Sequence, residues 1–305
     1  MNVQTFSPAA ISSFFAPHLT TDPLKCGAWG GGFTINRGVH VNLQVTFNTD
    51  KTIIENYINN VKVESCILNK LIQLLLPPEI EPCKIVVKQT IEVPIGGGFG
   101  TSGASALAIA LALAKALKLK QTYLQIAKAA HIADLQCKTG LGTVAGIIGG
   151  GFRIAIKPGA PGIAIIDRIP INEEDYYIIA ATYGPIPTKK VLSNPTKLKT
   201  IKKLGKQTLK QILKEPTPEN FMKQCKKFAL KTGFMTSRVK QAIQKAEKAG
   251  AIGATQNMIG EAIHTLVHKE NLQNVLNTLT KIFPKDKITI AKIDTRGPKI
   301  LTTKQ

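Results

Sequence analysis

The sequence predicts an α+β protein of two domains, and three observations lead to that prediction. The chain of 305 residues is long enough for two domains of ordinary size. Its strand-like and helix-like segments are interleaved without the regular alternation of βαβ units, which argues against a doubly wound parallel sheet. Beyond Thr188, lysine-rich helical segments dominate. We therefore expect an N-terminal domain over residues 1–170 and a C-terminal domain over residues 171–305.

The individual elements follow from hydrophobic periodicity and from the glycines and prolines that interrupt it. Strands are expected on both sides of a glycine-rich turn near the N-terminus, followed by an amphipathic helix over residues 61–76. Helices are predicted up to Leu117 and from about Thr122 to Gln136. The segment AGAIGATQNMIGEAIHTLV (residues 249–267) is predicted to form a turn and a helix. Further strands are predicted for CKIVVKQTIEV, GIAIIDRI, YYIIAATY and KITIAKIDT.

The formal net charge of +21 is the strongest feature of the composition. Between Lys189 and Lys231, thirteen lysines stand against two acidic residues, and there is no arginine. Nucleic-acid-binding surfaces generally add arginine forks and stacking aromatic rings. This segment contributes only Phe221 and Phe228 as aromatic residues. We therefore interpret it as a set of solvated helical faces, with a basic nucleic-acid-binding protein as the alternative.

The cysteines and the apolar segments bear on location. The five cysteines are odd in number, scattered and without a CxxC pair, so neither a zinc site nor a disulfide framework is expected. The N-terminal residues lack the basic segment of a signal peptide. The most apolar stretch, Ala104–Ala114, is about half the ~20 residues that a membrane span needs. These features favour a cytoplasmic protein.

The segment VPIGGGFGTSGASALAIALALAKAL, from Val93 to Leu117, places a glycine-rich loop before a long apolar helix. A dinucleotide-binding loop needs an acidic residue about 20 positions later, and no Asp or Glu occurs from Val93 to Ala133. A Walker loop needs a lysine where Ala104 stands. Glycine N–H groups at a helix N-terminus can still bind phosphate. The remaining interpretations are a phosphate loop of another kind and a turn that only caps a buried helix.

Residues 94–104, PIGGGFGTSGA, resemble the phosphate loop of the GHMP small-molecule kinases, P-x-G-x-G-L-G-S-S-A-A. SPAAISSFFAPH resembles the family's first motif, which lines the acceptor pocket, and AIGATQNMIGEAIHTLV resembles its third, which closes over the nucleotide. The resemblance implies an S5-domain-2-like N-terminal α/β domain, a ferredoxin-like C-terminal α+β domain, and ATP with Mg²⁺. It also implies that the ATP phosphates contact Gly96, Gly97, Gly98, Gly100, Thr101, Ser102 and Gly103.

Within this superfamily the sequence most resembles the archaeal pantoate kinase family. The resemblance rests on the N-terminal motif with the following DPLKCGAWGGGFTINRGV, on AHIADLQCKTGLGTVAGIIGGGFRI and on YGPIPTKKVLSNP. It implies phosphorylation of the 4-hydroxyl of pantoate in coenzyme A biosynthesis, and a homodimer fits the family. The family commonly has Ser-Arg in place of Ala28-Trp29 and an acidic residue in place of Thr143. Homoserine and mevalonate stay open as acceptors, as does a non-catalytic relative.

The candidate catalytic residues are Ser102, Asp134 and Thr143. Asp134 is the first acidic residue after the loop and lies in an apolar helical context, so we expect it to bind Mg²⁺ together with Ser102. Thr143 would hydrogen-bond the acceptor hydroxyl. His131 lies three residues before Asp134 on the same helical face, where it would either contact the acceptor or belong to a hydrogen-bonded core.

An acceptor with a carboxylate favours arginine partners, and the chain has only five arginines. Arg153, after a run of glycines, is the first candidate for substrate binding and Arg37 the second. Lys25 is a third candidate and equally a surface lysine. His264 and His268 have the i,i+4 spacing of a metal-binding pair on a helix, but we favour ordinary core or surface histidines.

Overall fold

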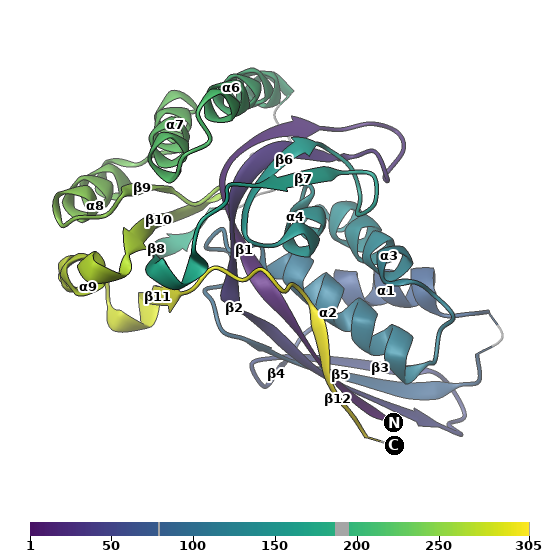
Figure 1. Ribbon diagram of the computed structural model, residues 1–305. Coiled ribbons are helices and arrows are strands. Elements are labelled where there is room, and N and C mark those ends of the chain that lie inside the picture. Colours follow the sequence, from purple (N-terminus) through teal and green to yellow (C-terminus); the bar gives the residue numbers. More distant parts are fainter. Residues whose placement is uncertain (79, 187–194, 305) are drawn as a thin grey trace.

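The larger of two sheets carries most of the N-terminal half of the chain. Figure 1 shows the computed structural model, which describes residues 1–78, 80–186 and 195–304. In these ranges the larger sheet has eight strands, two of which, β6 (Phe152–Lys157) and β7 (Ile165–Arg168), extend it beside β2. The β3–β5 pair is parallel and the other pairs are antiparallel. The main strand order is β12 (Lys299–Lys304), β1 (Asn2–His18), β2 (Gly27–Phe47), β5 (Cys83–Ile91), β3 (Ile53–Ile58) and β4 (Val61–Lys62).

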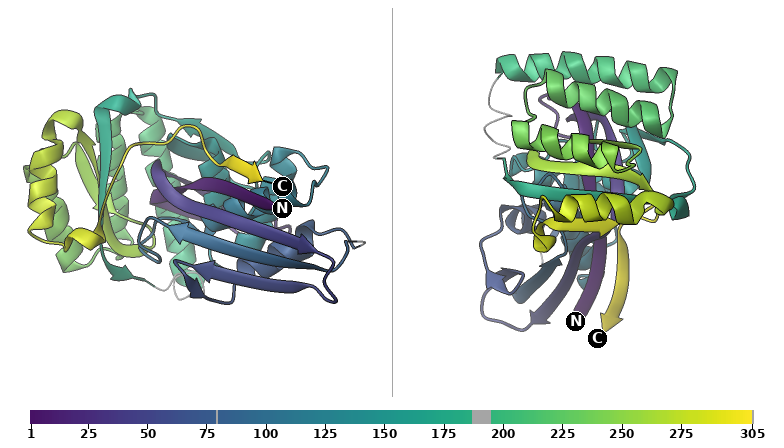
Figure 2. Two further views of the ribbon diagram at one scale, coloured as in Figure 1. Left: turned by 90° about the horizontal axis from the view of Figure 1, so that it is seen from below. Right: turned by 90° about the vertical axis from the view of Figure 1, so that its left-hand side faces the viewer.

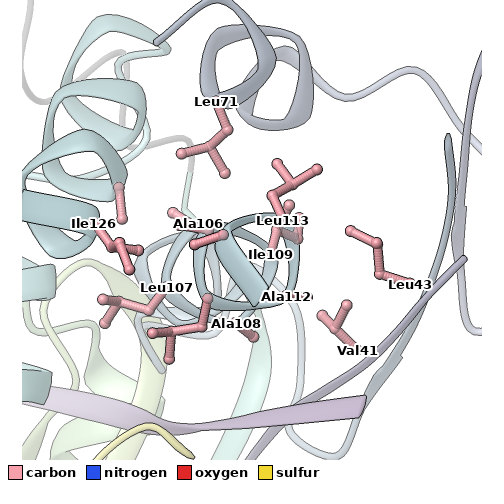
Figure 3. Packing of buried hydrophobic residues seen from close by; sticks show 14 of the residues in the cluster. Val41, Leu43, Leu71, Ala106, Leu107, Ala108, Ile109, Ala112, Leu113 and Ile126 are labelled. Atoms are coloured by element: carbon pink, nitrogen blue, oxygen red, sulfur yellow. The ribbon is translucent and has the colours of Figure 1, made fainter. Parts of the chain in front are cut away.

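Four helices cover one face of this sheet: α1 (Cys66–Leu75), α2 (Thr101–Ala116), α3 (Tyr123–Gln136) and α4 (Thr143–Gly149) (Figure 1). Helix α2 is apolar on all sides, as a helix at the centre of a core must be, and its Ala and Leu residues favour helix formation. It packs on β1 and β2 and is covered by α1 and α3. Figure 3 shows this core around Leu107, Ile109 and Leu113 of α2, with Val41 and Leu43 of β2 on one side.

The second sheet is antiparallel and belongs to the C-terminal half. Its order is β11 (Ile288–Ala291), β8 (Tyr176–Pro185), β10 (Gly260–His268) and β9 (Gly253–Gln256). Helices α6 (Pro195–Lys214), α7 (Pro218–Lys231), α8 (Ser237–Lys248) and α9 (Leu272–Thr280) accompany it (Figure 2). Three short 3₁₀ turns, Glu173–Asp175, Lys269–Asn271 and Lys285–Lys287, complete the described elements. Helix α6 also packs on β1, so the two halves share a continuous apolar core.

The chain changes sheets between β7, which ends at Arg168, and β8, which begins at Tyr176. The last strand, β12, then returns to pair with β1, so the two termini lie side by side (Figure 2). The larger sheet therefore contains strands from both ends of the chain. A single boundary at residue 170 would place β12 in a different domain from the sheet to which it belongs. A division into domains at that position stays a prediction.

Two predicted helices are corrected by the structure. Residues 61–76 begin with the short strand β4, and α1 starts only at Cys66, where the Ser65 hydroxyl caps the helix. Residues 249–267 form β9, a tight turn and β10 instead of a helix. Both faces of β10 are buried, and a strand buried on both faces lacks the alternating pattern that distinguishes it from a buried helix.

The structure also corrects the expectation of no disulfide, because Cys66 and Cys137 are joined. The bond links the first residue of α1 to the residue after α3, and packing of α1 on α3 brings together cysteines 71 positions apart. Spacing along the sequence cannot reveal such a pair. The other three cysteines are free and buried. None of the helices in the described ranges is long and apolar enough to cross a membrane.

Candidate active site

The glycine loop connects β5 to α2 and needs glycine at several positions. Gly96, Gly98 and Gly100 have φ values of 77°, 78° and 60°, which residues with a side chain rarely adopt. No described side chain caps α2, so the first N–H groups of this sixteen-residue helix are open to a ligand. The carbonyl of Phe99 accepts a hydrogen bond from the N–H of Ala10 in β1, which holds the loop against the sheet.

The loop forms one wall of a cavity of about 160 Å³. The other walls come from β1 and the first part of β2, from residues 139–143 after α3, from β6, and from the turn between β9 and β10. Of the predicted site residues, Ser102, Thr143 and Arg153 line this cavity, and Asp134 lies directly behind the wall. Five phosphate-loop residues, Gly96, Gly98, Gly100, Thr101 and Ser102, also line it.

Asp134 is 2% exposed and is surrounded by hydroxyl groups. The Thr139 hydroxyl donates to its Oδ1 at 2.7 Å. Burial raises the pKa of Asp134, and hydrogen bonds from Thr139 and Ser102 oppose that rise. Gly140 is packed so closely that a Cβ there would lie 2.0 Å from Oδ2 of Asp134. Sequence reasoning missed Thr139 and Gly140, although the segment TGLG that contains Gly140 directly follows the helix of Asp134.

Arg153 is a buried cation for which the described residues provide no carboxylate within ion-pair distance. It is 5% exposed, its Nη2 donates to the Ile11 carbonyl at 3.4 Å, and its Nε has no partner. Burial lowers its pKa to about 10. Gly146 leaves room for the guanidinium, because a Cβ there would lie 2.6 Å from Nη1. Among the described residues that line the cavity, Arg153 is the only charged one.

Of the three residues named above as departures from the expected family pattern, Ala28 and Thr143 line the cavity. The methyl group of Thr143 packs against Gly100 and Gly103, so this residue supports the phosphate loop. Trp29 is not in the cavity wall. The centroids of the Trp29 and His18 rings are 5.1 Å apart. The ammonium nitrogen of Lys206 lies over the Trp29 ring, 4.1 Å from the ring centroid.

The remaining predicted residues lie away from the cavity wall. Arg37 pairs with Glu92, and Lys25 pairs with Asp22 with a side chain that is 69% exposed. Both side chains are exposed and neither lines the cavity, so the structure does not bring them to the other predicted site residues. His131 is buried, and one ring nitrogen contacts the Pro23 carbonyl at 3.1 Å, in the turn that leads to Ala28. Burial lowers the pKa of His131.

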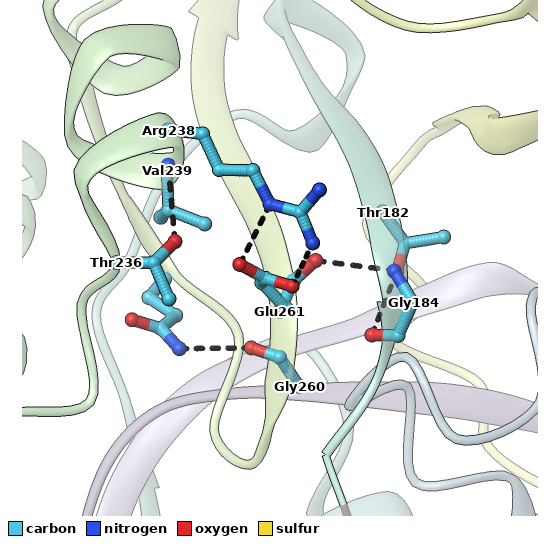
Figure 4. Close-up of polar contacts among 8 residues, drawn as sticks. Thr182, Gly184, Thr236, Arg238, Val239, Gly260 and Glu261 are labelled. Carbon is cyan, nitrogen blue, oxygen red and sulfur yellow. Dashed lines mark hydrogen bonds and ion pairs between the residues drawn. The ribbon is translucent and has the colours of Figure 1, made fainter.

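The two histidines with i,i+4 spacing lie on strand β10 and not on a helix. His264 is buried and bonded to Ser13 and Asn257, whereas His268 contacts Glu270. Glu261, the acidic residue on the same strand that could join them as a ligand, is paired with Arg238, whose Nε donates to its Oε1 at 2.8 Å (Figure 4). The described residues contain no group of three His, Cys, Asp or Glu side chains that could bind a metal. Residues 187–194 of the segment YGPIPTKKVLSNP, which include Lys189 and Lys190, lie outside the described residues.

A glycine loop at an uncapped helix, a carboxylate behind it and an arginine facing the same cavity fit the site that the resemblance to the GHMP kinases implies. Residues 61–151 match the N-terminal domain of that family. The chain is 33% identical over 303 residues to the pantoate kinase of Thermococcus kodakarensis, with 98% of each chain covered. It is 32% identical over 274 residues to the pantoate kinase of Methanocaldococcus jannaschii, covering 90% of this chain and 96% of the relative. The protein belongs to the pantoate kinase family.

Solved structures agree with this assignment. A phosphotransferase related to the coenzyme A biosynthesis pathway superposes with a TM-score of 0.89 at 31% identity, covering 98% of both chains. Mevalonate diphosphate decarboxylase from Staphylococcus aureus superposes with a TM-score of 0.73 at 16% identity, covering 99% of this chain and 98% of that one, a similarity of fold alone. The predicted α+β fold of a GHMP kinase is confirmed.

Proposed function

We propose that the protein transfers the γ-phosphoryl group of ATP to the 4-hydroxyl of (R)-pantoate, giving 4-phosphopantoate in archaeal coenzyme A biosynthesis. Its family supports this proposal. The observation that carries it is the position of Arg153, an unpaired buried guanidinium that faces the same cavity as the glycine loop. One cavity therefore offers a place for a carboxylate and a place for a triphosphate.

The nucleotide end of the cavity is built for phosphate and a divalent cation. The loop glycines and the first turn of α2 would donate N–H groups to the phosphate oxygens. Asp134 and Ser102 provide a carboxylate and a hydroxyl, oxygen ligands of the kind that Mg²⁺ prefers. The setting of Asp134 fits this role, because a buried carboxylate with only hydroxyl partners gains stability in its ionised form when a cation binds. Bound Mg²⁺ would neutralise charge on the triphosphate.

The acceptor end combines one cation with apolar walls. Phe14, Phe15 and Met258 line the cavity together with Ile259. These side chains suit the two methyl groups of pantoate, while Arg153 takes the carboxylate and directs the 4-hydroxyl toward the loop. His131 would support this end through the turn at Pro23. Its direct contact with an acceptor stays a prediction, as does a hydrogen bond from Thr143 to the acceptor hydroxyl.

Phosphoryl transfer in this cavity would rely on positioning. No carboxylate is found among the described residues of the wall, and Thr143 cannot act as a base at neutral pH. The transition state of phosphoryl transfer is loose, so alignment and charge neutralisation supply most of the catalysis. The acceptor oxygen would bond to the γ-phosphorus as the bond to the bridging oxygen of ATP breaks and ADP leaves. The hydroxyl proton would pass to an oxygen of the transferred phosphoryl group or to water. We place this ATP-dependent reaction in the cytoplasm, and propose the family's homodimer as the oligomeric state.

The decisive experiment measures ADP release from Mg-ATP with pantoate, homoserine, mevalonate or no acceptor. We expect turnover with pantoate alone. The variants Ser102→Ala and Asp134→Ala should lose it, because the two groups would hold the Mg²⁺ that neutralises the triphosphate. The matched control is Lys25→Ala, which changes a solvated residue away from the cavity and should leave the rate unchanged.

Each other outcome contradicts a separate part of the proposal. Turnover with homoserine or mevalonate would replace the acceptor and leave the reaction class intact. Binding of ATP without turnover on any acceptor would indicate the non-catalytic relative. A protein that binds no ATP would overturn the assignment of the glycine loop.

A further inference from the structure

A chain of buried side chains joins three distant parts of the molecule behind the phosphate loop. Ser13 Oγ in β1 lies 2.7 Å from Nε2 of His264 in β10, a residue 251 positions away. Nδ1 of His264 lies 2.8 Å from Oδ1 of Asn257, and Nδ2 of Asn257 lies 3.0 Å from the carbonyl oxygen of Gly97. All three side chains are 0% exposed. We call Ser13, His264 and Asn257 the anchor chain.

The chemistry of its ends fixes the direction of every hydrogen bond in the anchor chain. The Gly97 carbonyl can only accept, so the amide of Asn257 must present its NH₂ group there and its oxygen to His264. That oxygen can only accept, so Nδ1 of His264 carries the proton and Nε2 carries a lone pair. The Ser13 hydroxyl then donates to Nε2. Burial lowers the pKa of His264 to about 3, so the ring is neutral and each group has one role.

Close packing leaves the turn between β9 and β10 no freedom to shift against the loop. A Cβ on Gly260 would lie 2.6 Å from the carbonyl carbon of Gly97, and one on Gly98 would lie 2.8 Å from the Cβ of Asn257. The N–H of Met258 also donates to the Ser12 carbonyl at 2.8 Å. The turn is therefore fixed to both β1 and the glycine loop, and Asn257 is held at the contact.

We propose that Asn257 is a positioning residue for the nucleotide, acting on the peptide between Gly97 and Gly98. In a trans peptide the C=O and the following N–H point in opposite directions. Holding the Gly97 carbonyl on Asn257 turns the N–H of Gly98 away from the anchor chain, and Gly98 lines the cavity. His264 and Ser13 act through Asn257 by fixing its amide. The inference rests on the proposed function only in that the cavity binds ATP.

The test compares Asn257→Ala with Thr255→Val. Thr255 lies two residues earlier and is fully buried, and its hydroxyl group has no hydrogen-bond partner. Replacing that hydroxyl by a methyl group changes the packing at a neighbouring buried site and removes no contact with the glycine loop. Asn257→Ala removes the hydrogen bond to the Gly97 carbonyl and leaves Nδ1 of His264 without its partner. We expect it to raise the KM for ATP on the order of tenfold, with the KM for the acceptor changed less than about twofold. Thr255→Val should leave both constants unchanged.

Two further variants separate positioning from general damage. His264→Ala should raise the KM for ATP without raising that for the acceptor, and combining it with Asn257→Ala should add little, because both act through one contact. If Asn257→Ala does not fold, Ser13→Ala provides the milder change, with an expected rise of about twofold. Equal rises in both KM values, or additive effects in the double variant, would overturn the positioning role.

Calorimetric titration with ATP, without an acceptor, keeps this test separate from the proposed function. A wild type that binds ATP but turns over no acceptor leaves the comparison of Asn257→Ala with Thr255→Val intact. A wild type that binds no ATP would overturn both proposals. Equal ATP affinity in wild type and Asn257→Ala would overturn the positioning role alone.

Discussion

The guanidinium of Arg153 carries a positive charge where the described residues supply no negative one. Moving a charge out of water costs several kcal/mol unless a partner repays it. Arg153 has one long hydrogen bond to a backbone carbonyl and an unpaired Nε, so its contacts offset little of this desolvation cost. The space that Gly146 leaves open shows that the fold accommodates the group. Such a residue is expected where an anionic ligand completes the site.

Arg153→Met separates the stability of the protein from its affinity for the acceptor. Methionine fills a similar volume without a charge, so we expect the free energy of unfolding to rise by roughly 1 kcal/mol or more. The KM for pantoate should rise at least about tenfold, since a charge-assisted hydrogen bond contributes roughly 1.5–3 kcal/mol. Urea unfolding and steady-state kinetics measure the two effects. Arg37→Met, which alters an arginine outside the cavity, is the control, and similar changes in both variants would refute the assignment.

His264 makes the stability of the protein sensitive to acid. Its pKa is about 3 when folded and near 6.5 when exposed, so the unfolded chain binds the proton more readily. The stabilisation is complete above pH 6.5 and is lost as the pH falls toward 3, with a slope of up to about 1.4 kcal/mol per pH unit. We expect the urea midpoint to fall between pH 7 and pH 4.5. His264→Gln should show a shallower fall, and parallel curves for the two proteins would contradict this origin.

At the scale of the element, the site depends on short glycine-containing turns between rigid elements. Asp134 is carried by α3, whose N-terminus has a capping box formed by Thr122 and Gln125. The turn after α3 then folds back so that Thr139 donates to the carboxylate and Gly140 packs against it. This arrangement fixes one rotamer of Asp134 beside the first turn of α2. The helix provides the position and the turn provides the orientation.

Gly140→Ala tests that orientation. The added methyl group would lie 2.0 Å from Oδ2 of Asp134, so the carboxylate must move. We expect kcat to fall by about tenfold or more and the Mg²⁺ concentration for half-maximal rate to rise, because small displacements of catalytic groups are costly. Gly233→Ala is the control, since its φ of 69° imposes a backbone penalty where no atom lies within 4 Å. An unchanged Mg²⁺ dependence in Gly140→Ala would contradict the role of Asp134.

At the scale of the whole molecule, features formed by residues close together in the sequence could be predicted, whereas contacts between distant residues could not. The glycine loop and its place before α2 could be predicted from the sequence, because a loop at a helix N-terminus is built from consecutive residues. The roles of Ser102 and Asp134 stay predictions. The partners of His264 could not, since Ser13 is 251 positions away and β10 is buried on both faces. For a similar reason the sequence did not reveal that Arg37 and Lys25 lie outside the cavity wall. Only the packed fold decides which basic residues near a glycine turn face the cavity.

The net charge of +21 is a property of the whole molecule. Helix α6 brings part of that charge close to the cavity through its lysines. Lys206 covers the ring of Trp29, a residue between two that line the cavity. Lys203, Lys210 and Lys214 on the same helix are exposed. A field of this sign raises the association rate of anionic ligands and weakens with salt, because the Debye length is about 10 Å at 0.1 M.

We therefore expect kcat/KM for ATP to fall several-fold between 50 and 500 mM KCl with kcat nearly unchanged, as electrostatic steering acts on association alone. The triple variant Lys203→Gln, Lys210→Gln and Lys214→Gln should have a smaller slope, because it removes exposed charge from α6 without changing the cavity wall. Steady-state kinetics at each salt concentration, with and without added RNA, measure the effect. RNA that inhibits at 50 mM salt and loses its effect steeply with salt would instead support a nucleic-acid surface on α6. A slope equal in wild type and triple variant would refute steering by this helix.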